Sequence, residues 1–233
     1  MSDRPHDQLR DVKLEIPFTT STPGSVLFSM GRTKVLCTAS VGSEVPRWMR
    51  DTGRGWITAE YAMLPGSSGE RVRRDHVSGG RAKEISRLIG RSLRAGVDLR
   101  ALGEAMAVVD CDVIEADGGT RTAAITGAWI ALHYAFEDAV ARGQLASSPI
   151  IDEVAAVSVG IVEGRPTLDL DYAQDVEAEV DMNVVMSGRG LLVEIQGTAE
   201  RAPFTRAELD QLLDLAGSGI AELHDLQRRA VAE

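Results

Sequence analysis

MAVVDCDVIEADGGTRTAAITGAWIAL, residues 106–132, is the stretch that decides how this chain folds. Its first nine residues alternate and are rich in valine, which predicts a strand over 106–114. Its last part is apolar and alanine-rich, which predicts a helix from about Thr122 to Arg142. Gly118 and Gly119 lie between the two and permit a tight turn. The stretch therefore predicts a strand–turn–helix unit in the middle of the chain.

The turn itself, Asp117-Gly118-Gly119-Thr120-Arg121-Thr122, has two interpretations. The first N–H groups of a helix lack partners within the helix, and together with the helix dipole they attract anions. Glycine lets an anion approach the backbone closely, Thr120 offers a hydroxyl, and Arg121 can bind a phosphate through two donors. The alternative is an ordinary turn with a threonine cap. The turn alone leaves both interpretations open.

Length and composition set the broad class of protein. The chain has 233 residues, enough for one large domain or two closely packed halves. Its 44% hydrophobic and 26% charged residues are ordinary for a soluble globular protein. No apolar run approaches the length of a membrane span, and the polar start MSDRPH lacks a signal-peptide core. We therefore expect a cytoplasmic protein with no membrane partner.

The cysteines and histidines suggest no chemistry of their own. Cys37 and Cys111 each lie in a strand-like apolar run, which favours buried reduced thiols over a disulfide or a nucleophile. The four histidines are scattered without the spacing of metal ligands, so zinc is not expected.

A basic segment interrupts an otherwise acidic chain. The net charge is −10, yet residues 65–94 contain seven Arg and one Lys against three acids, a local net charge of +5. We expect a helix from Lys83 to Leu102, with basic residues on the side opposite its apolar face. A solvated helix face is the alternative, but the preceding loop is also basic and rich in glycine, which favours contact with RNA or another polyanion. The basic residues on the helix are Lys83, Arg87, Arg91 and Arg94, and those of the loop include Arg71, Arg73 and Arg74.

An acidic cluster occupies residues 169–181. Strand alternation places Asp169 and Asp171 on one face of a strand, and Asp181 on the polar face of the next. Carboxylates that lie close together repel one another, so they need solvent, an arginine or a cation between them. A ligand set of oxygen atoms without His or Cys favours Mg²⁺ or Mn²⁺. The alternative is a polar strand face with an acidic surface turn. The other members are Asp175, Glu177 and Glu179.

Strand pairs and helices recur in both halves of the chain. Glycine turns at 31–32, 163–165 and 187–189 each separate two alternating runs, which predicts three hairpins. A third helix is expected to begin at a capping box formed by Thr205 and Glu208. The pattern predicts an α+β fold of two similar units within one domain, 1–233, joined near residues 142–150. The possible anion site at residues 117–122, the basic segment 65–94 and the acidic cluster 169–181 together fit phosphoryl chemistry on a polyanion. The sequence contains no Walker-type motif, which argues against nucleotide triphosphate hydrolysis.

Six ordered segments resemble bacterial ribonuclease PH, and the similarity runs from about Gln8 into the last helix. They are residues 33–41, 55–65, 84–94, 110–122, 181–186 and 194–200. The resemblance implies a duplicated βαβα-type unit, assembled as a hexameric ring of dimers. It also implies a reversible reaction in which inorganic phosphate removes the 3′-terminal nucleotide of tRNA precursors and other RNA as a nucleoside diphosphate.

The resemblance also assigns residues. It implies that the attacking phosphate binds Arg81, Gly119, Thr120 and Arg121, and that a divalent metal, Mg²⁺ or Mn²⁺, binds Asp175 and Asp181. Together with the charge of the basic segment 65–94, the resemblance implies that RNA binds Arg71, Arg73, Arg74 and Arg87. Two other functions remain: a catalytically silent RNA-binding ring subunit of the same fold, and a hydrolytic nuclease with the same metal set. A silent subunit is expected to lose the site arginines or aspartates, which are all present.

The chain also departs from the family pattern in two places. The N-terminal run Ser2-Asp-Arg-Pro-His lacks the usual glycine, and the loop between Pro65 and Arg81 is shorter than usual. Ala82 stands where the family usually has a hydroxyl residue. These departures concern RNA grip and ring assembly, and they leave the expected phosphate and metal residues in place.

Overall fold

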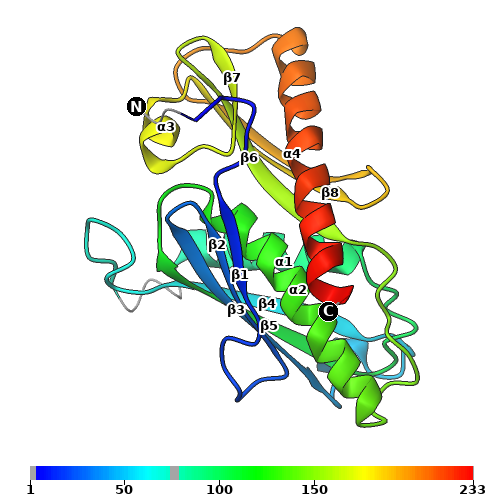
Figure 1. The fold of residues 1–233 in the computed structure, drawn as a ribbon. Helices are drawn as coiled ribbons and strands as arrows, with labels where there is room; N and C mark the ends of the chain where they lie inside the picture. Colours follow the sequence, from blue (N-terminus) through cyan, green and yellow to red (C-terminus); the bar gives the residue numbers. More distant parts are fainter. Residues whose placement is uncertain (1–3, 74–78, 233) are drawn as a thin grey trace.

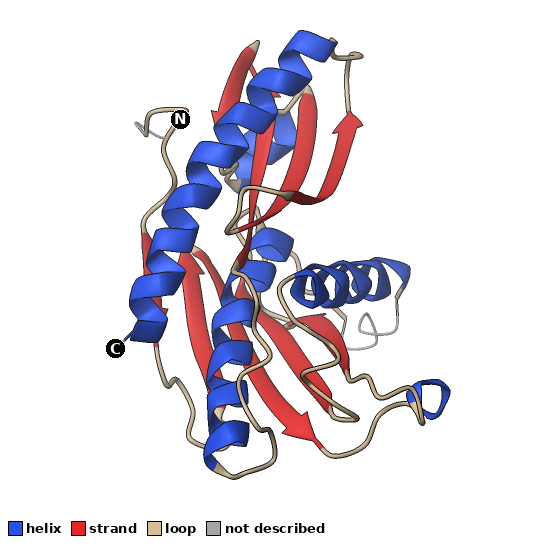
Figure 2. Cartoon of the chain, turned by 90° about the vertical axis from the view of Figure 1, so that its right-hand side faces the viewer, coloured by secondary structure: helices blue, strands red, loops and turns tan. Residues whose placement is uncertain are grey.

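The computed structural model describes residues 4–73 and 79–232 as two β-sheets with helices packed between and against them (Figures 1 and 2). The first sheet has the strand order β1-β2-β3-β5-β4 and the second β7-β6-β8-β9. The first contains β1 (Val12–Glu15), β2 (Gly24–Met30), β3 (Thr33–Gly42), β4 (Trp56–Met63) and β5 (Met106–Glu115). The second contains β6 (Val154–Val162), β7 (Arg165–Leu168), β8 (Val180–Ser187) and β9 (Leu192–Ala199). The helices are the 3₁₀ turn Arg47–Met49, α1 (Gly80–Ala95), α2 (Thr120–Ala141), α3 (Tyr172–Glu177) and α4 (Arg206–Ala232).

Helix α2 is the centre of the core. It packs against β2 and β3 of the first sheet, against β6 of the second, and against α1 and α4. A helix that is covered on every side must be apolar all round, and fourteen of its residues are buried. This explains why the segment after Thr122 shows no polar face in the sequence. Helix α4 lies along β6 and β7 and reaches α2 at its C-terminal end (Figure 1).

The predicted strand–turn–helix unit and the three hairpins are confirmed. Strand β5 leads directly into α2, and the pairs β2–β3, β6–β7 and β8–β9 are antiparallel. Helix α4 begins with the predicted capping box, in which Thr205 Oγ1 accepts from the Glu208 N–H while a Glu208 carboxylate oxygen accepts from the Thr205 N–H. Cys37 and Cys111 lie opposite each other on β3 and β5. Both thiols are buried and form no disulfide, as predicted.

The first predicted helix was placed too late in the chain. It begins at Gly80 and ends at Ala95, where Gly96 donates its N–H to the Leu93 carbonyl and ends the helix. A side chain at Gly96 would approach the Asp152 carbonyl to 2.6 Å, so tertiary packing fixes this end. The apolar residues that extended the pattern toward Leu102 belong to the connection that follows.

The prediction that Asp169 and Asp171 share a strand face was wrong. Strand β7 ends at Leu168, and Asp169 adopts a left-handed backbone conformation with φ of 54°. Asp171 is instead the N-cap of α3, where its carboxylate accepts from the Gln174 N–H. The alternating pattern failed here because a buried ion pair and a helix cap override the preference for extended backbone.

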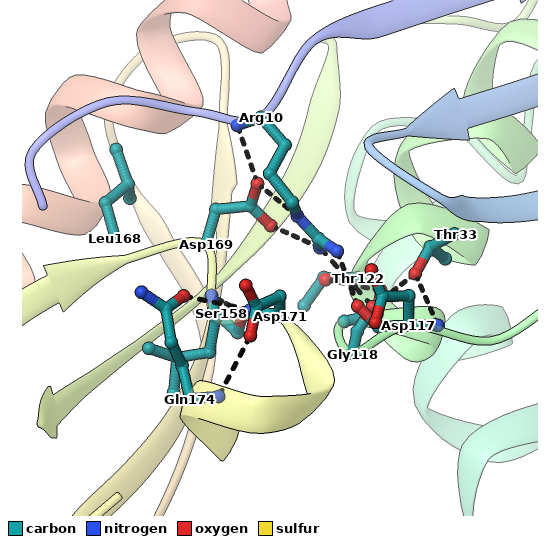
Figure 3. Close-up of polar contacts among 12 residues, drawn as sticks. Arg10, Thr33, Asp117, Gly118, Thr122, Ser158, Leu168, Asp169, Asp171 and Gln174 are labelled. Carbon is teal, nitrogen blue, oxygen red and sulfur yellow. Dashed lines mark hydrogen bonds and ion pairs between the residues drawn. The ribbon is translucent and has the colours of Figure 1, made fainter. Parts of the chain in front are cut away.

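The buried ion pair joins Asp169 to Arg10 (Figure 3). The Arg10 side chain is 8% exposed and that of Asp169 is fully buried. Arg10 donates its backbone N–H and its Nε to Asp169 Oδ2, both at 2.9 Å, and its Nη2 to Oδ1 at 2.7 Å. The same guanidinium donates to the carbonyls of Asp117 and Gly118. One side chain thus ties the N-terminal segment to the end of β7 and to the turn before α2.

Within the described ranges, no helix is long and apolar enough to cross a membrane.

Asp169→Asn tests the ion pair directly. The variant leaves the Arg10 charge buried without its partner, so the free energy of unfolding should fall by about 3 kcal/mol in urea titrations. Arg206→Ala, which breaks an exposed pair with Asp210 on α4, should change it by less than about 0.5 kcal/mol. Equal, small effects of both substitutions would contradict the structural role of the pair.

Candidate active site

The start of α2 is an open donor site. Gly119 is the N-cap in a left-handed conformation with φ of 65°, and no side chain of the described residues caps the helix. The N–H groups of the first turn therefore have no partner within the helix and none from a capping side chain. Thr120 is the first helical residue, and its hydroxyl faces Tyr61 rather than the backbone. The threonine-cap interpretation of the turn is therefore wrong.

The turn is fixed by contacts to its carbonyl groups. Thr33 Oγ1 donates to the Gly118 carbonyl at 2.6 Å and accepts from the Asp117 N–H at 3.0 Å. Arg10 donates to both carbonyls from the other direction. Gly118 has φ of 78°, and a side chain there would approach the Leu170 carbonyl to 2.4 Å. The backbone before α2 is thus held in one conformation, with the donors of the first turn left available.

Two arginines and two aspartates meet near this helix start. Arg81 lies in the first turn of α1, Arg121 in that of α2, Asp175 in α3 and Asp181 in β8. Burial, then the nearby Asp175 carboxylate, raises the pKa of Asp181 to about 6, while Arg121 and Arg81 oppose the shift. Charges shift a pKa in this way over short distances, so Asp175 and the two arginines lie within electrostatic range of the Asp181 carboxyl group. The fold therefore brings together the residues expected to bind phosphate and those expected to bind metal.

Asp175 lies at the rim of the same group. Partial removal from water raises the pKa of its carboxyl group, although the residue keeps much of its surface exposed. Arg81 and Arg121 again act in the opposite direction. Two carboxylates that both hold their protons more tightly than usual form a site where a divalent cation would relieve their repulsion.

The rest of the acidic cluster serves other purposes. Glu177 pairs with Arg201 at 2.9 Å, and Glu179 accepts from the Gly164 N–H. Within the described residues, no group of three or more His, Cys, Asp or Glu is arranged to hold a metal ion. Asp175 and Asp181 nevertheless fit Mg²⁺, which binds through one or two carboxylates when substrate phosphates supply further oxygens.

Arg121 is held in place from β9. Gln196 Oε1 accepts from Arg121 at 3.2 Å, and a Glu84 carboxylate oxygen lies 3.9 Å from the same guanidinium nitrogen. Gln196 in turn donates to Glu84 and Glu194, and Glu194 lies 2.6 Å from Arg91. This chain of polar contacts orients the guanidinium beside the helix start.

Two of the four basic residues predicted on α1 are engaged in contacts within the chain. Arg91 is engaged by Glu194, and Arg94 lies over the Trp56 ring while donating to the Ile57 carbonyl. Burial lowers the pKa of Arg94, as expected for a packed guanidinium. Lys83 and Arg87 are exposed. The prediction of one continuous basic stripe was therefore wrong at its C-terminal end, because Arg94 completes the packing of β4.

The loop residues of the expected RNA surface are less fully placed. Arg71 and Arg73 are exposed at the end of the described segment, and Arg74 lies outside the described residues. No contact joins Arg71 or Arg87 to the group around Arg121 in the described residues. The RNA-binding assignment of Arg71, Arg73, Arg74 and Arg87 therefore stays a prediction.

Three residues of the site were not predicted. Tyr61 approaches Thr120 with 2.8 Å between the hydroxyl oxygens, and Gln196 and Glu84 contact Arg121. All three lie in segments that carry the family resemblance. An alternation pattern marks Tyr61 only as an inward-facing strand residue, so pattern alone could not have found its partner.

Comparison with known protein families finds two matches along the chain. The 3′ exoribonuclease family matches over residues 8–136 through its domain 1 and over residues 152–219 through its domain 2. The chain belongs to the 3′ exoribonuclease family. Relatives named ribonuclease PH are 55% identical over 98% of this chain in Corynebacterium efficiens and 56% identical over 99% in Methylorubrum populi. These matches cover 94% and 99% of the relatives' own lengths.

Solved structures share the fold at low identity. An Archaeoglobus fulgidus exosome with RNA bound to the active site superposes with a TM-score of 0.81 at 21% identity, covering 97% of this chain and 90% of that one. Rice Rrp46 gives 0.78 at 17% identity and covers 97% of both chains. The predicted α+β fold and the predicted family are thus confirmed.

The raised pKa of Asp181 predicts a pH-dependent stability of the metal-free protein. The folded chain holds this proton up to about pH 6, whereas the unfolded chain releases it near pH 3.8. Its stabilising contribution is therefore complete below pH 3.8 and lost as the pH rises through 6. Asp181→Asn should escape this loss and gain about 2 kcal/mol over the wild type at pH 7.5, and about a third of that at pH 4.5.

Thermal melting in a chelating buffer measures this difference. Asp210→Asn, on the exposed side of α4, is the matched control and should show no gain at either pH. A gain of Asp181→Asn that is the same at pH 4.5 and 7.5 would contradict the assigned burial of this carboxylate.

Proposed function

We propose that this chain is a phosphate-dependent 3′-to-5′ exoribonuclease that trims tRNA precursors and other RNA. Inorganic phosphate attacks the 3′-terminal phosphodiester, and a nucleoside diphosphate leaves. The observation that carries this proposal is the uncapped start of α2 with Arg81 and Arg121 beside it. The high identity to relatives named ribonuclease PH over nearly the whole chain supports it.

The nucleophile requires a positive environment. Phosphate and the RNA phosphodiester are both anions, so the reaction must overcome their repulsion before the in-line attack. The first-turn N–H groups of α2, the Thr120 hydroxyl and the two guanidiniums would bind the phosphate and offset this repulsion. Holding the nucleophile in line with the scissile bond also removes much of the entropic barrier. No covalent intermediate with the protein is needed.

The two aspartates supply the metal site in this proposal. Asp175 and Asp181 would hold Mg²⁺ or Mn²⁺, whose charge stabilises negative charge on the scissile group when it is bound. Arg81 and Arg121 both oppose the rise in the pKa of Asp175 and of Asp181, so nucleophile and metal would lie in one site.

The RNA chain would approach along exposed basic residues. Arg71, Arg73, Arg74 and Arg87 are proposed to contact the phosphate backbone, which gives little sequence preference and strong salt dependence. We further propose a cytoplasmic hexamer built as a trimer of dimers, as the family resemblance implies. An archaeal exosome core shares the fold with a TM-score of 0.76 at 20% identity.

A single assay separates this function from its alternatives. Purified protein is incubated with a 3′-tailed RNA and Mg²⁺, with and without inorganic phosphate, and the products are separated by chromatography. Nucleoside diphosphates that form only with phosphate support the proposal. Nucleoside monophosphates would indicate hydrolysis, and intact RNA would indicate a silent RNA-binding subunit.

In the same assay Arg121→Ala should lower kcat/KM by about 10²–10³-fold, because a preorganised donor to the reacting anion is lost. Its melting temperature should stay within about 2 °C of the wild type, since Arg121 contributes little to the core. Arg142→Ala, which removes an exposed guanidinium at the other end of α2, should leave turnover unchanged. Unchanged turnover of Arg121→Ala would exclude the helix start as the phosphate site.

A further inference from the structure

The buried phenol of Tyr61 contacts Thr120, a residue of the proposed phosphate site. The Tyr61 residue is 3% exposed, and its hydroxyl oxygen lies 2.8 Å from Thr120 Oγ1. The backbone of Tyr61 is fixed twice: β4 pairs with β5 in parallel register, and the Tyr61 N–H donates to Ser86 of α1. The phenol therefore meets the first residue of α2 from a rigid position.

The proton count decides the direction of this hydrogen bond. Each hydroxyl has one proton, so one of the two oxygens must accept. Thr120 is partly exposed at the helix start, and its proton can reach solvent or a bound anion. The described residues give the buried phenol no acceptor besides Thr120. If Thr120 donated instead, the phenol proton would be buried without a partner, which is unfavourable.

The acidity of the two groups supports the same direction. A phenol is a stronger donor than an aliphatic alcohol. Burial raises the pKa of Tyr61, while the hydrogen bond with Thr120 and the charges of Arg81 and Arg121 oppose the shift, so the phenol stays protonated at neutral pH.

We propose that Tyr61 is a positioning residue, which donates to Thr120 Oγ1 and thereby leaves the threonine proton directed at the attacking phosphate. This inference rests on the proposed function, because it assigns a phosphate to the start of α2. It explains why the inner face of β4 carries a polar group at this position, next to Ile57 and Ala59, which pack into the core. A phenylalanine would fill the same space but would leave the rotation of the Thr120 hydroxyl undetermined.

The test compares Tyr61→Phe with Thr120→Ala and with the double variant in the phosphorolysis assay. Tyr61→Phe should raise the KM for phosphate about tenfold, while kcat and the KM for RNA change less than twofold. Thr120→Ala should raise the same KM, and adding Tyr61→Phe to it should have no further effect, because the phenol acts only through that hydroxyl. Thr120→Ser keeps the hydroxyl, so in that background Tyr61→Phe should again raise the KM.

Tyr134→Phe is the matched control, since this tyrosine on α2 donates to the Ala230 carbonyl at the other end of the helix. It should leave the KM for phosphate unchanged. Calorimetric titration with inorganic phosphate alone provides a second readout that does not depend on RNA cleavage. A weaker phosphate affinity of Tyr61→Phe supports the inference even if the RNA assay refutes the proposed reaction.

Two results would overturn the inference while leaving the proposed function intact. One is an active Tyr61→Phe enzyme whose KM and affinity for phosphate equal those of the wild type. The other is a double variant whose loss is the product of the two single losses, because independent effects show that the phenol does not act through Thr120.

Discussion

A buried ion pair between Arg10 and Asp169 is the constraint on which the rest of the structure depends. Removing two charges from water costs several kcal/mol for each ion, and only close, fully hydrogen-bonded geometry offsets this cost. Arg10 meets that condition because it donates three hydrogen bonds to the Asp169 carboxylate and further ones to the carbonyls of Asp117 and Gly118. The end of β7, the N-terminal segment and the turn before α2 therefore adopt one mutual arrangement (Figure 3). We infer that this pair fixes geometry more than it adds stability.

The site depends on that arrangement because each of its parts comes from a different element. The first sheet and α1 contribute Tyr61 and Arg81, the turn contributes the start of α2, and the second sheet with α3 contributes the two aspartates. In the proposed reaction the positive groups bind the attacking anion and the carboxylates bind a cation. A shift of one half of the chain against the other would separate the two sets. The ion pair thus links the fold to the proposed chemistry.

The sequence predicted the elements well and the tertiary exceptions poorly. Alternation and glycine turns located β5, α2 and the three hairpins, because those signals are local. They failed at Asp169, whose backbone is set by a partner far away in the chain, and at Arg94, whose guanidinium packs on Trp56. The turn before α2 was predicted from its glycines, but the contact of Tyr61 with Thr120, at 2.8 Å, joins two elements that are far apart in the sequence. Such contacts leave no periodic trace in a sequence.

The central claim is that inorganic phosphate binds at the start of α2 as the nucleophile. A crystal structure of the protein grown with phosphate tests it most directly. The account predicts a phosphate within hydrogen-bond distance of a first-turn N–H of α2, the Thr120 hydroxyl and the Arg121 guanidinium, with Tyr61 behind the threonine. A phosphate bound elsewhere, with the helix start occupied only by water at saturating phosphate, would contradict the claim.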